Sequence, residues 1–176
     1  MTTYEDELES PFATELFEAP RAPTVGVGSA TITAIEATTQ GKLAGDNGTA
    51  GGRVRVTRLG FTVVAPRDVA TGLASGKRRY QPLTFRCDPG PLTPQLFQAL
   101  VANEVLKVVR FELSRADRTG QQTTYLTIEL TGVTLSGLQT IQEPGQPPAM
   151  EVALVFQRIE MKASGRVAND SWVASP

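Results

Sequence analysis

The sequence predicts a mainly β domain: a small β-barrel or sandwich of bent antiparallel strands with one short α-helix packed alongside. Three observations predict this fold. Most of the chain alternates apolar and polar residues with a period of two, as half-buried strands do. Three of the alternating runs change parity midway, which moves the buried face and requires a bulge or a sharp bend. Only one segment has helical spacing, and a lone short helix must pack on a sheet because it is unstable in water.

The first half of the chain contains three predicted strands. Residues 29–37 are rich in β-branched residues, residues 53–64 form a longer alternating run, and residues 83–87 form a short one. The apolar positions of the second run change parity near Thr57-Arg58. A bend is therefore expected there.

The helical signature follows the third strand. Thr93 is a suitable N-cap residue, and Pro94 falls at the first helical position, where its missing N–H costs nothing. Apolar residues then recur at i, i+1, i+4 and i+5. They predict the face that packs on the barrel: Leu96, Phe97, Leu100 and Val101.

Three more strands are predicted in the second half of the chain. They run from Val109 to Leu113, from Leu126 to Leu135 and from Val152 to Met161. The second of these changes parity across Thr131-Gly132, and the third changes parity across Gln157-Arg158. Strands that bend in this way indicate a curled sheet rather than a flat layer.

Charge divides the chain into a tail and a body. Residues 1–20 hold six acidic and no basic residues, which leaves 17 basic against 12 acidic residues in the remainder. We expect residues 1–27 to form an acidic, flexible N-terminal extension and residues 28–176 to form a single domain. The alternative for the extension is a docking peptide, because Phe12, Leu16 and Phe17 would share one face of a helix. The basic excess of the body is too small to indicate nucleic-acid binding.

Composition argues against catalysis. The chain has no histidine, which removes Ser-His-Asp and Cys-His catalysis and histidine-based zinc sites. The single Cys87 excludes an intrachain disulfide and lies in an apolar strand position, so a buried, inert thiol is expected. Glu112 and Glu129 are the one candidate carboxylate pair, but a salt-bridged surface is the better interpretation because Arg110 lies nearby. We expect no catalytic residue, cofactor or metal.

No run is long enough to span a membrane, and the acidic N-terminus does not resemble a secretory signal. Synthesis in the cytoplasm, without a cleavable signal peptide and without membrane insertion, is therefore expected. The longest connection, residues 66–79, is Gly-containing and basic at Lys77-Arg78-Arg79. These basic residues could bind phosphate or nucleic acid, but no aromatic array accompanies them, and contact with a neighbouring subunit is at least as good an interpretation.

Several segments together are similar to one protein family. A basic Ser75-Gly-Lys-Arg loop, an extended Pro-Leu-Thr-Phe segment and the helix Leu92-Thr-Pro-Gln-Leu-Phe-Gln-Ala-Leu occur in succession. Tyr125-Leu-Thr-Ile-Glu-Leu and Val155-Phe-Gln-Arg-Ile-Glu-Met follow at two later strands. This order resembles the haemolysin-coregulated protein (Hcp) family, the tube proteins of type VI secretion systems. The acidic first 25 residues are not part of the family pattern.

The resemblance implies a small closed β-barrel with a flanking helix, assembled into hexameric rings that stack into a hollow tube. The implied partners are further copies of the chain, the sheath, baseplate and spike proteins of the machine, and effector proteins in the lumen. It also implies secretion after assembly in the cytoplasm. Three groups of residues take on roles by this resemblance: ring stacking for Arg67, Asp68, Lys77, Arg78 and Arg79; packing of the helix on the barrel for Leu96, Phe97 and Leu100; and a lumen-facing position for Gln95 and Gln98.

Two other functions are compatible with the residues. One is a monomeric β-barrel that acts as a binding or adaptor module through its acidic tail or its basic loop. The other is an enzyme that uses Glu112 and Glu129, which the missing catalytic groups disfavour. The mass of the particle in solution separates a ring from a monomer.

Overall fold

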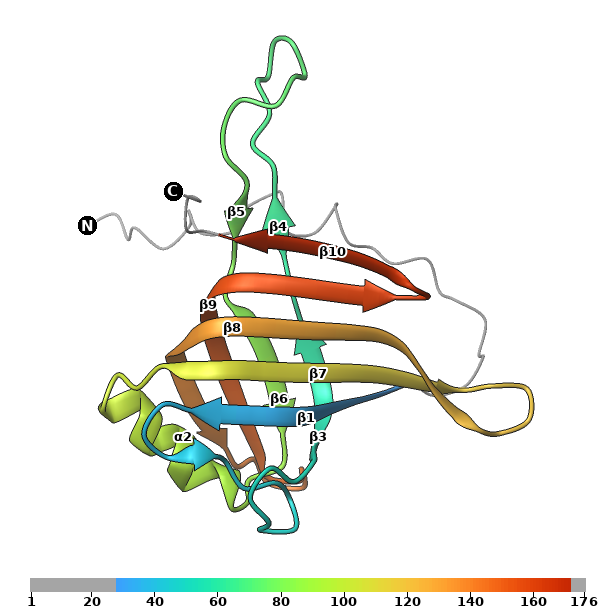
Figure 1. The fold of residues 1–176 in the computed structure, drawn as a ribbon. Coiled ribbons are helices and arrows are strands. Elements are labelled where there is room, and N and C mark those ends of the chain that lie inside the picture. The colour runs from blue at the N-terminus through green and yellow to red at the C-terminus, as the bar shows by residue number, and fades with distance from the viewer. Residues whose placement is uncertain (1–27, 172–176) are drawn as a thin grey trace.

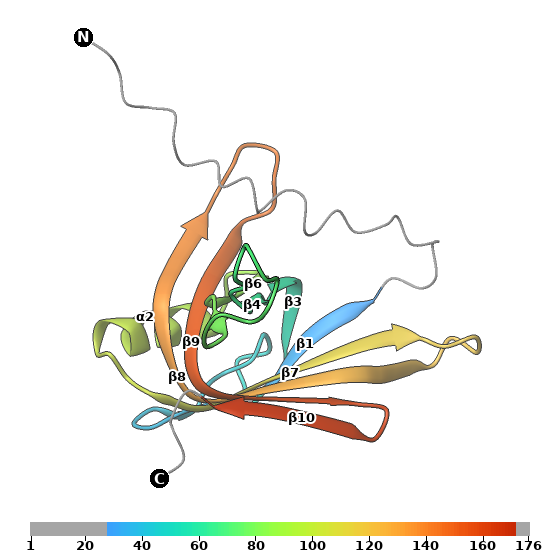
Figure 2. The ribbon, with the colours of Figure 1, turned by 90° about the horizontal axis from the view of Figure 1, so that it is seen from above.

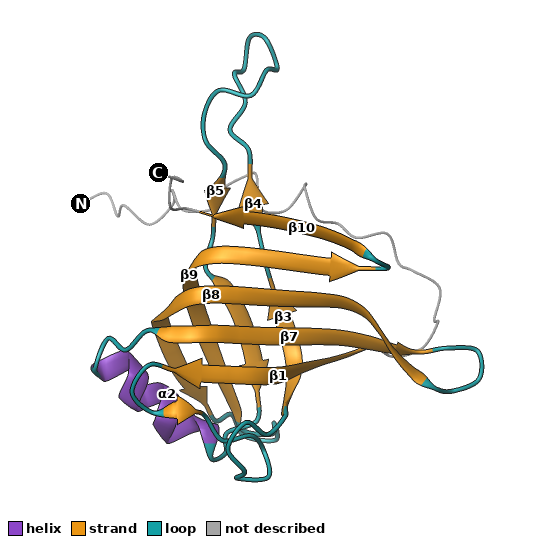
Figure 3. Ribbon diagram, viewed as in Figure 1, coloured by secondary structure: helices purple, strands orange, loops and turns teal. Residues whose placement is uncertain are grey.

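The computed structural model describes residues 28–171 (Figure 1). The predicted N-terminal extension, residues 1–27, and Trp172 lie outside the described residues. The described part of the chain is built almost entirely of strands, with a single helix (Figure 3). In chain order the elements are β1 (Ser29–Ala37), β2 (Gly41–Lys42), β3 (Val54–Gly60), β4 (Val63–Val64), β5 (Arg79–Tyr80), β6 (Leu83–Cys87), α2 (Leu92–Val101), β7 (Leu106–Ala116), β8 (Gln122–Ile141), β9 (Ala149–Ala163) and β10 (Arg166–Ser171).

The main sheet closes on itself. Neighbouring strands pair in the order β9, β6, β3, β1, β7, β8, and β8 pairs again with β9. All of these pairings are antiparallel. The result is the predicted closed barrel, here of six strands. Two further strands of the main sheet lie outside this ring, since β10 pairs with β9 and the short β2 pairs with β1, and β4 and β5 form a separate sheet.

Bends in the long strands allow the closure. Leu130 and Val133 of β8 are both buried although they are three positions apart, a spacing that points two side chains to opposite faces of a regular strand. Gly132 lies between them and has φ +62°. Their partners on β9, Ile159 and Phe156, are buried in the same way. Both strands therefore change their buried face at the same row and cross from one wall of the barrel to the other (Figure 2). The parity changes at residues 131–132 and 157–158 thus marked real bends.

The bend predicted in the second strand is also present. The pairing of β3 with β6 shifts register between Val56 and Arg58, so one extra residue is accommodated at Thr57. The predicted run 53–64 is also divided into two strands, but at residues 61–62, beyond this bulge. β3 belongs to the barrel, whereas β4 leaves it and begins a separate hairpin with β5.

The core fills the barrel with large apolar side chains. Phe111 is fully buried and meets the ring of Phe85 edge-on, with 5.7 Å between ring centroids. A second aromatic cluster lies beside it, where Tyr80 contacts Phe61 and Phe156 at centroid distances of 6.1 and 5.7 Å. Offset and edge-on contacts of this kind stabilise aromatic pairs beyond their buried area.

The helix α2 packs against β8 and contributes to the same core. Leu92, Leu96 and Ala99 are its buried residues, and Leu100 is partly buried against the core. The prediction that Phe97 packs on the barrel was wrong, because 57% of its side chain is exposed. Successive residues turn by roughly 100° around a helix, so when Leu92, Leu96 and Ala99 face the core, Phe97 points outward.

The ends of the helix are fastened differently from the prediction. The N-cap residue is Pro91, and the Thr93 hydroxyl instead accepts a hydrogen bond from the backbone N–H of Gly90 at 3.1 Å. After the helix, the buried carboxylate of Glu104 accepts hydrogen bonds from the backbone N–H groups of Thr39 and Gln40. The Gln40 side-chain amide also donates to this carboxylate, at 2.9 Å. The Gln40 side-chain bond most of all, and then the two backbone bonds, lower the pKa of Glu104 and tie the end of the helix to the turn that follows β1.

A candidate assembly surface

A hairpin projects from the barrel between β3 and β6 (Figure 1). At its base, Val63 pairs with Tyr80 and Val64 pairs with Arg79. Farther out, one isolated bridge joins Arg67 to Ala74. The paired part is therefore short, and the outer part extends beyond the body of the domain.

Local hydrogen bonds shape the tip of this hairpin. One carboxylate oxygen of Asp68 accepts bonds from the backbone N–H groups of Ala70 and Thr71 and from the Thr71 hydroxyl, at 2.8 to 3.1 Å. These bonds lower the pKa of Asp68, the Thr71 backbone bond most of all. Across the turn, the Arg67 guanidinium donates to the backbone oxygen of Gly72 at 3.1 Å. The tip thus has a defined turn although its side chains bury little surface.

The tip also presents apolar side chains to solvent. Val69 is fully exposed and Leu73 is 70% exposed. The part of the chain that the structure describes does not bury these side chains, and an exposed apolar patch rimmed by polar groups marks an interaction site. The tip therefore has the composition of a contact surface.

The base of the hairpin is fastened to β10. The carboxylate of Asp170 accepts hydrogen bonds from the Arg78 guanidinium and the Tyr80 hydroxyl, and it forms an ion pair with Arg78. The contact with Arg78, followed by that with Tyr80, holds the pKa of Asp170 well below its usual range. We call this group of three residues the clamp. It joins the projection to the last described strand.

The predicted stacking residues all lie on this hairpin: Arg67, Asp68, Lys77, Arg78 and Arg79. Asp68 and Arg67 build the tip, and Arg78 turns back to the barrel in the clamp. Their contact with another ring remains a prediction. The prediction covered the whole loop, residues 66–79, but it singled out the charged residues and not the apolar Val69 and Leu73. It also missed Asp170, which carries no local signal.

The outward face of α2 is a second exposed surface. Phe97 and Val101 are 57% and 61% exposed, and Val105 just beyond the helix is 41% exposed. Gln98 is also exposed on this face. That it faces the lumen of a ring stays a prediction. Gln95 instead reaches into the domain, because its side-chain oxygen accepts the backbone N–H of Ala44 at 2.7 Å.

The described residues hold no arrangement typical of catalysis. Glu129 pairs with Arg110 at 2.6 Å, and Glu112 accepts a hydrogen bond from the Thr33 hydroxyl at 3.3 Å. Cys87 is buried, and burial raises its pKa to about 12, which keeps it a neutral thiol. Between residues 28 and 171 there is no cluster of metal-ligating side chains. Within the same range no helix is long and apolar enough to cross a membrane.

Comparison with known protein families identifies this arrangement. The family described as "Type VI secretion system effector, Hcp" matches residues 31–162, from the first barrel strand to the end of β9. The chain belongs to the Hcp family. Hcp proteins are the tube subunits of type VI secretion systems, and this chain is a subunit of that kind. No match was found among curated proteins.

Solved Hcp structures share the fold at low sequence identity. A crystal structure of an Hcp protein is 20% identical with a TM-score of 0.74, and the match covers 81% of this chain and 99% of that chain. The secreted protein Hcp3 from Pseudomonas aeruginosa is 19% identical with a TM-score of 0.69, and the match covers 84% of this chain and 100% of that chain. A type VI secretion system effector from Yersinia pestis is also 19% identical, with a TM-score of 0.58, and the match covers 82% of this chain and 99% of that chain. At this identity the likeness shows the fold alone.

Proposed function

We propose that the Hcp barrel assembles into six-membered rings and that the projecting hairpin joins each ring to the next. Stacked rings then enclose a hollow lumen. The observation that carries the proposal is the combination of the Hcp family match with a hairpin whose apolar tip is not covered by any of the described residues, 28–171. Val69 and Leu73 would bury their side chains in the adjacent ring, and the basic residues Lys77 and Arg79 would lie at the contact's polar edge.

The lateral contacts within a ring are proposed to use the outward face of α2. Phe97, Val101 and Val105 form an apolar strip there, and burial of such strips stabilises subunit interfaces. In a closed ring every subunit presents the same two complementary surfaces, so the strip is covered in all copies. Gln98, which stands beside the strip, is then placed near the lumen or the interface.

The partners follow from this role. We propose that the sheath, baseplate and spike proteins of a contractile machine contact the assembled tube, and that effector proteins travel in its lumen. The role requires no catalytic step from this chain. It also places the protein in the cytoplasm during assembly and outside the cell after firing.

The test compares the native protein with a variant whose hairpin tip is charged. Size-exclusion chromatography with light scattering should give six times the 18.8 kDa chain mass, and negative-stain microscopy should show rings and stacks. Val69→Asp combined with Leu73→Asp should leave the rings intact and abolish the stacks, because two carboxylates cannot be buried at the contact.

Arg118→Glu is the matched control, because this exposed residue lies in the β7–β8 turn rather than on the hairpin. Its stacks should persist. Stacking by the tip variant at the native level would overturn the role of the hairpin. A monomer at all concentrations and salt conditions would overturn ring formation and favour a monomeric binding module.

A further inference from the structure

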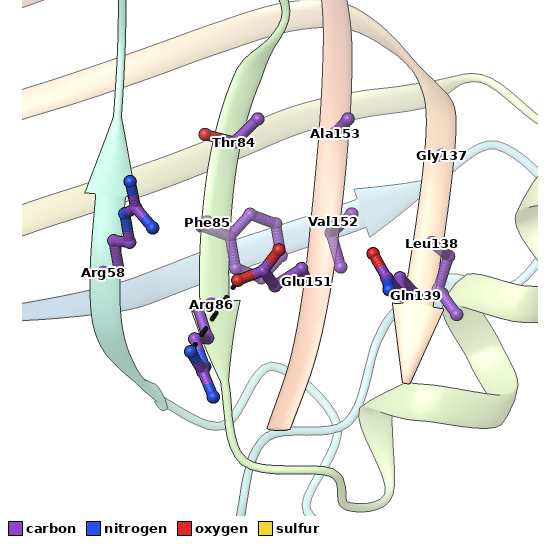
Figure 4. A pocket seen from close by; sticks show the side chains of 10 residues that line it. All are labelled: Arg58, Thr84, Phe85, Arg86, Gly137, Leu138, Gln139, Glu151, Val152 and Ala153. Carbon is purple, nitrogen blue, oxygen red and sulfur yellow. Dashed lines mark ion pairs between the residues drawn. The ribbon is translucent and has the colours of Figure 1, made fainter. Parts of the chain in front are cut away.

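A groove crosses the outer face of one barrel wall, where β3, β6, β9 and β8 lie side by side (Figure 4). Its volume is about 410 Å³. The groove exists because small residues are aligned across three strands: Thr84 pairs with Ala153, and Ala153 pairs with Gly137. With no large side chain in this row, the wall is hollowed from β6 to β8.

The next row of the same wall carries long polar side chains. Arg58 pairs with Arg86, and Arg86 pairs with Glu151. The two arginines face a single carboxylate here, and the closest distance between Arg86 and Glu151 is 3.8 Å, at the outer limit of an ion pair. Arg58 is exposed and forms no ion pair with the described residues. The groove thus combines an apolar floor with a positive rim, which fits an apolar segment flanked by carboxylates.

The start of the described chain lies close to this rim. Ala30 of β1 pairs antiparallel with Val56 of β3, so Ser29 and Gly28, which precede Ala30, continue along the part of β3 that leads to Arg58. Nine residues lie between Glu18 and Gly28, and the ten steps from one Cα to the other span roughly 33 Å in an extended chain. The chain that connects residues 12–18 to Gly28 is therefore long enough for this segment to reach the groove of its own barrel.

The same segment has the chemistry that the groove requires. Residues 12–18 read Phe-Ala-Thr-Glu-Leu-Phe-Glu, three large apolar side chains with two carboxylates, and no basic residue occurs in the first 20 positions. We propose that residues 12–18 bind in this groove of their own chain, with the apolar side chains over Ala153 and Gly137 and the carboxylates at Arg58 and Arg86. The outward face of α2 is apolar but has no basic residue in its last turn, so it lacks the positive rim.

Photo-crosslinking of the full-length protein tests the site. Phe17 is replaced by benzoylphenylalanine, the protein is irradiated, and the linked peptides are identified by mass spectrometry. The expected links fall on residues 84–86, 137–139 and 151–153. Arg58→Glu should reduce their yield several-fold by reversing the charge at the rim, whereas Arg118→Glu, the control far from the groove, should leave the yield unchanged. Added salt should lower the yield as well.

Gly137→Leu provides a second variant that fills the groove itself. A Cβ at Gly137 would meet only Ala153, at 3.9 Å, so the new side chain should occupy the hollow without a clash at its root. Links on another surface, or equal yields from Arg58→Glu and Arg118→Glu, would overturn the proposal. A mixture of ¹⁵N-labelled and unlabelled protein distinguishes chains: links between differently labelled copies would show that the segment binds a neighbour, which contradicts binding within one chain.

Ring formation is read separately in the same samples. If rings form and the links are absent, the groove proposal fails alone. If links form in a protein that stays monomeric, the groove stands while ring assembly fails.

Discussion

The barrel and the projecting hairpin hold their shapes by different means. In the barrel, large side chains such as Phe111 are fully removed from water and each packs on several strands. In the hairpin, Val69 and Leu73 are exposed, and the shape depends on the hydrogen bonds of Asp68 and on the clamp at Asp170. Changes in the barrel should therefore alter the free energy of unfolding, whereas changes in the hairpin should alter assembly. Four substitutions test this division, in order of decreasing effect on the barrel.

Phe111→Ala should have the largest effect. The side chain is buried at the centre of the barrel against Phe85, and its removal leaves a cavity that neighbouring strands can fill only in part. Loss of a buried phenylalanine costs about 3–5 kcal/mol of unfolding free energy. Urea denaturation followed by circular dichroism measures this value. A loss below about 1 kcal/mol would contradict a single, tightly packed core.

Gly132→Ala should have a smaller effect, because it strains the backbone rather than emptying the core. The residue has φ +62°, a conformation that costs a residue with a side chain about 1–2 kcal/mol. A Cβ there would also lie 2.6 Å from the side-chain oxygen of Gln157. Gly137→Ala on the same strand is the control, since its Cβ has room and its φ is not positive. Equal midpoints of urea denaturation for the two variants would show that the bend does not depend on glycine.

Phe97→Ser should change the stability of the isolated subunit by less than about 0.5 kcal/mol, because its side chain is already exposed. Leu96→Ala, one position away but buried, should cost about 2–5 kcal/mol. Thermal unfolding of both variants measures the contrast. A large loss from Phe97→Ser in a monomeric sample would restore the packing role predicted from the sequence.

Asp170→Asn should leave the barrel unchanged and loosen the hairpin. Trypsin should cleave after Lys77, Arg78 and Arg79 faster in the variant than in the native protein, and the rate of appearance of the fragments measures this. Equal cleavage rates would show that the hairpin does not depend on the clamp.

The clamp should also resist acid. Because Arg78 lowers the pKa of Asp170 below the ordinary value of 3.8, the carboxylate stays charged at a pH where a free aspartate is protonated. Its contribution is complete above that ordinary value and is lost only as the pH falls through the lower pKa of the folded protein. Hydrogen exchange of residues 63–80, corrected for the intrinsic rate, should remain slower in the native protein than in Asp170→Asn as the pH falls through 3.8.

The sequence predicted those features that depend on neighbouring residues. Alternation located the strands, and the parity change at Thr131-Gly132 located a bend, because a strand's buried face is encoded by its own residues. The helix was found, but its face was misjudged: Phe97 resembled a core residue until Leu92 and Ala99 were seen to define the buried side. The spacing of the apolar stripe does not reveal how many residues before the stripe the helix begins.

The clamp and the groove could not be predicted because each joins distant parts of the chain. Asp170 lies 92 residues after Arg78, and no local pattern relates the two. The groove depends on the register that aligns Thr84, Ala153 and Gly137 on three strands, and register between distant strands follows from the closure of the whole barrel. The length and basic composition of residues 66–79 indicated contact with another subunit, and the Hcp resemblance added the role in ring stacking. The projecting form of the hairpin was not predicted.

The position of Asp170 in the chain has a consequence for synthesis. The ribosome completes the hairpin long before it makes β10, so the nascent protein carries the tip without the residue that fastens its base. Truncated products that end before β10 would therefore display an unfastened hairpin and should enter growing polymers poorly. The clamp thus forms only after nearly the whole of the described chain has been made.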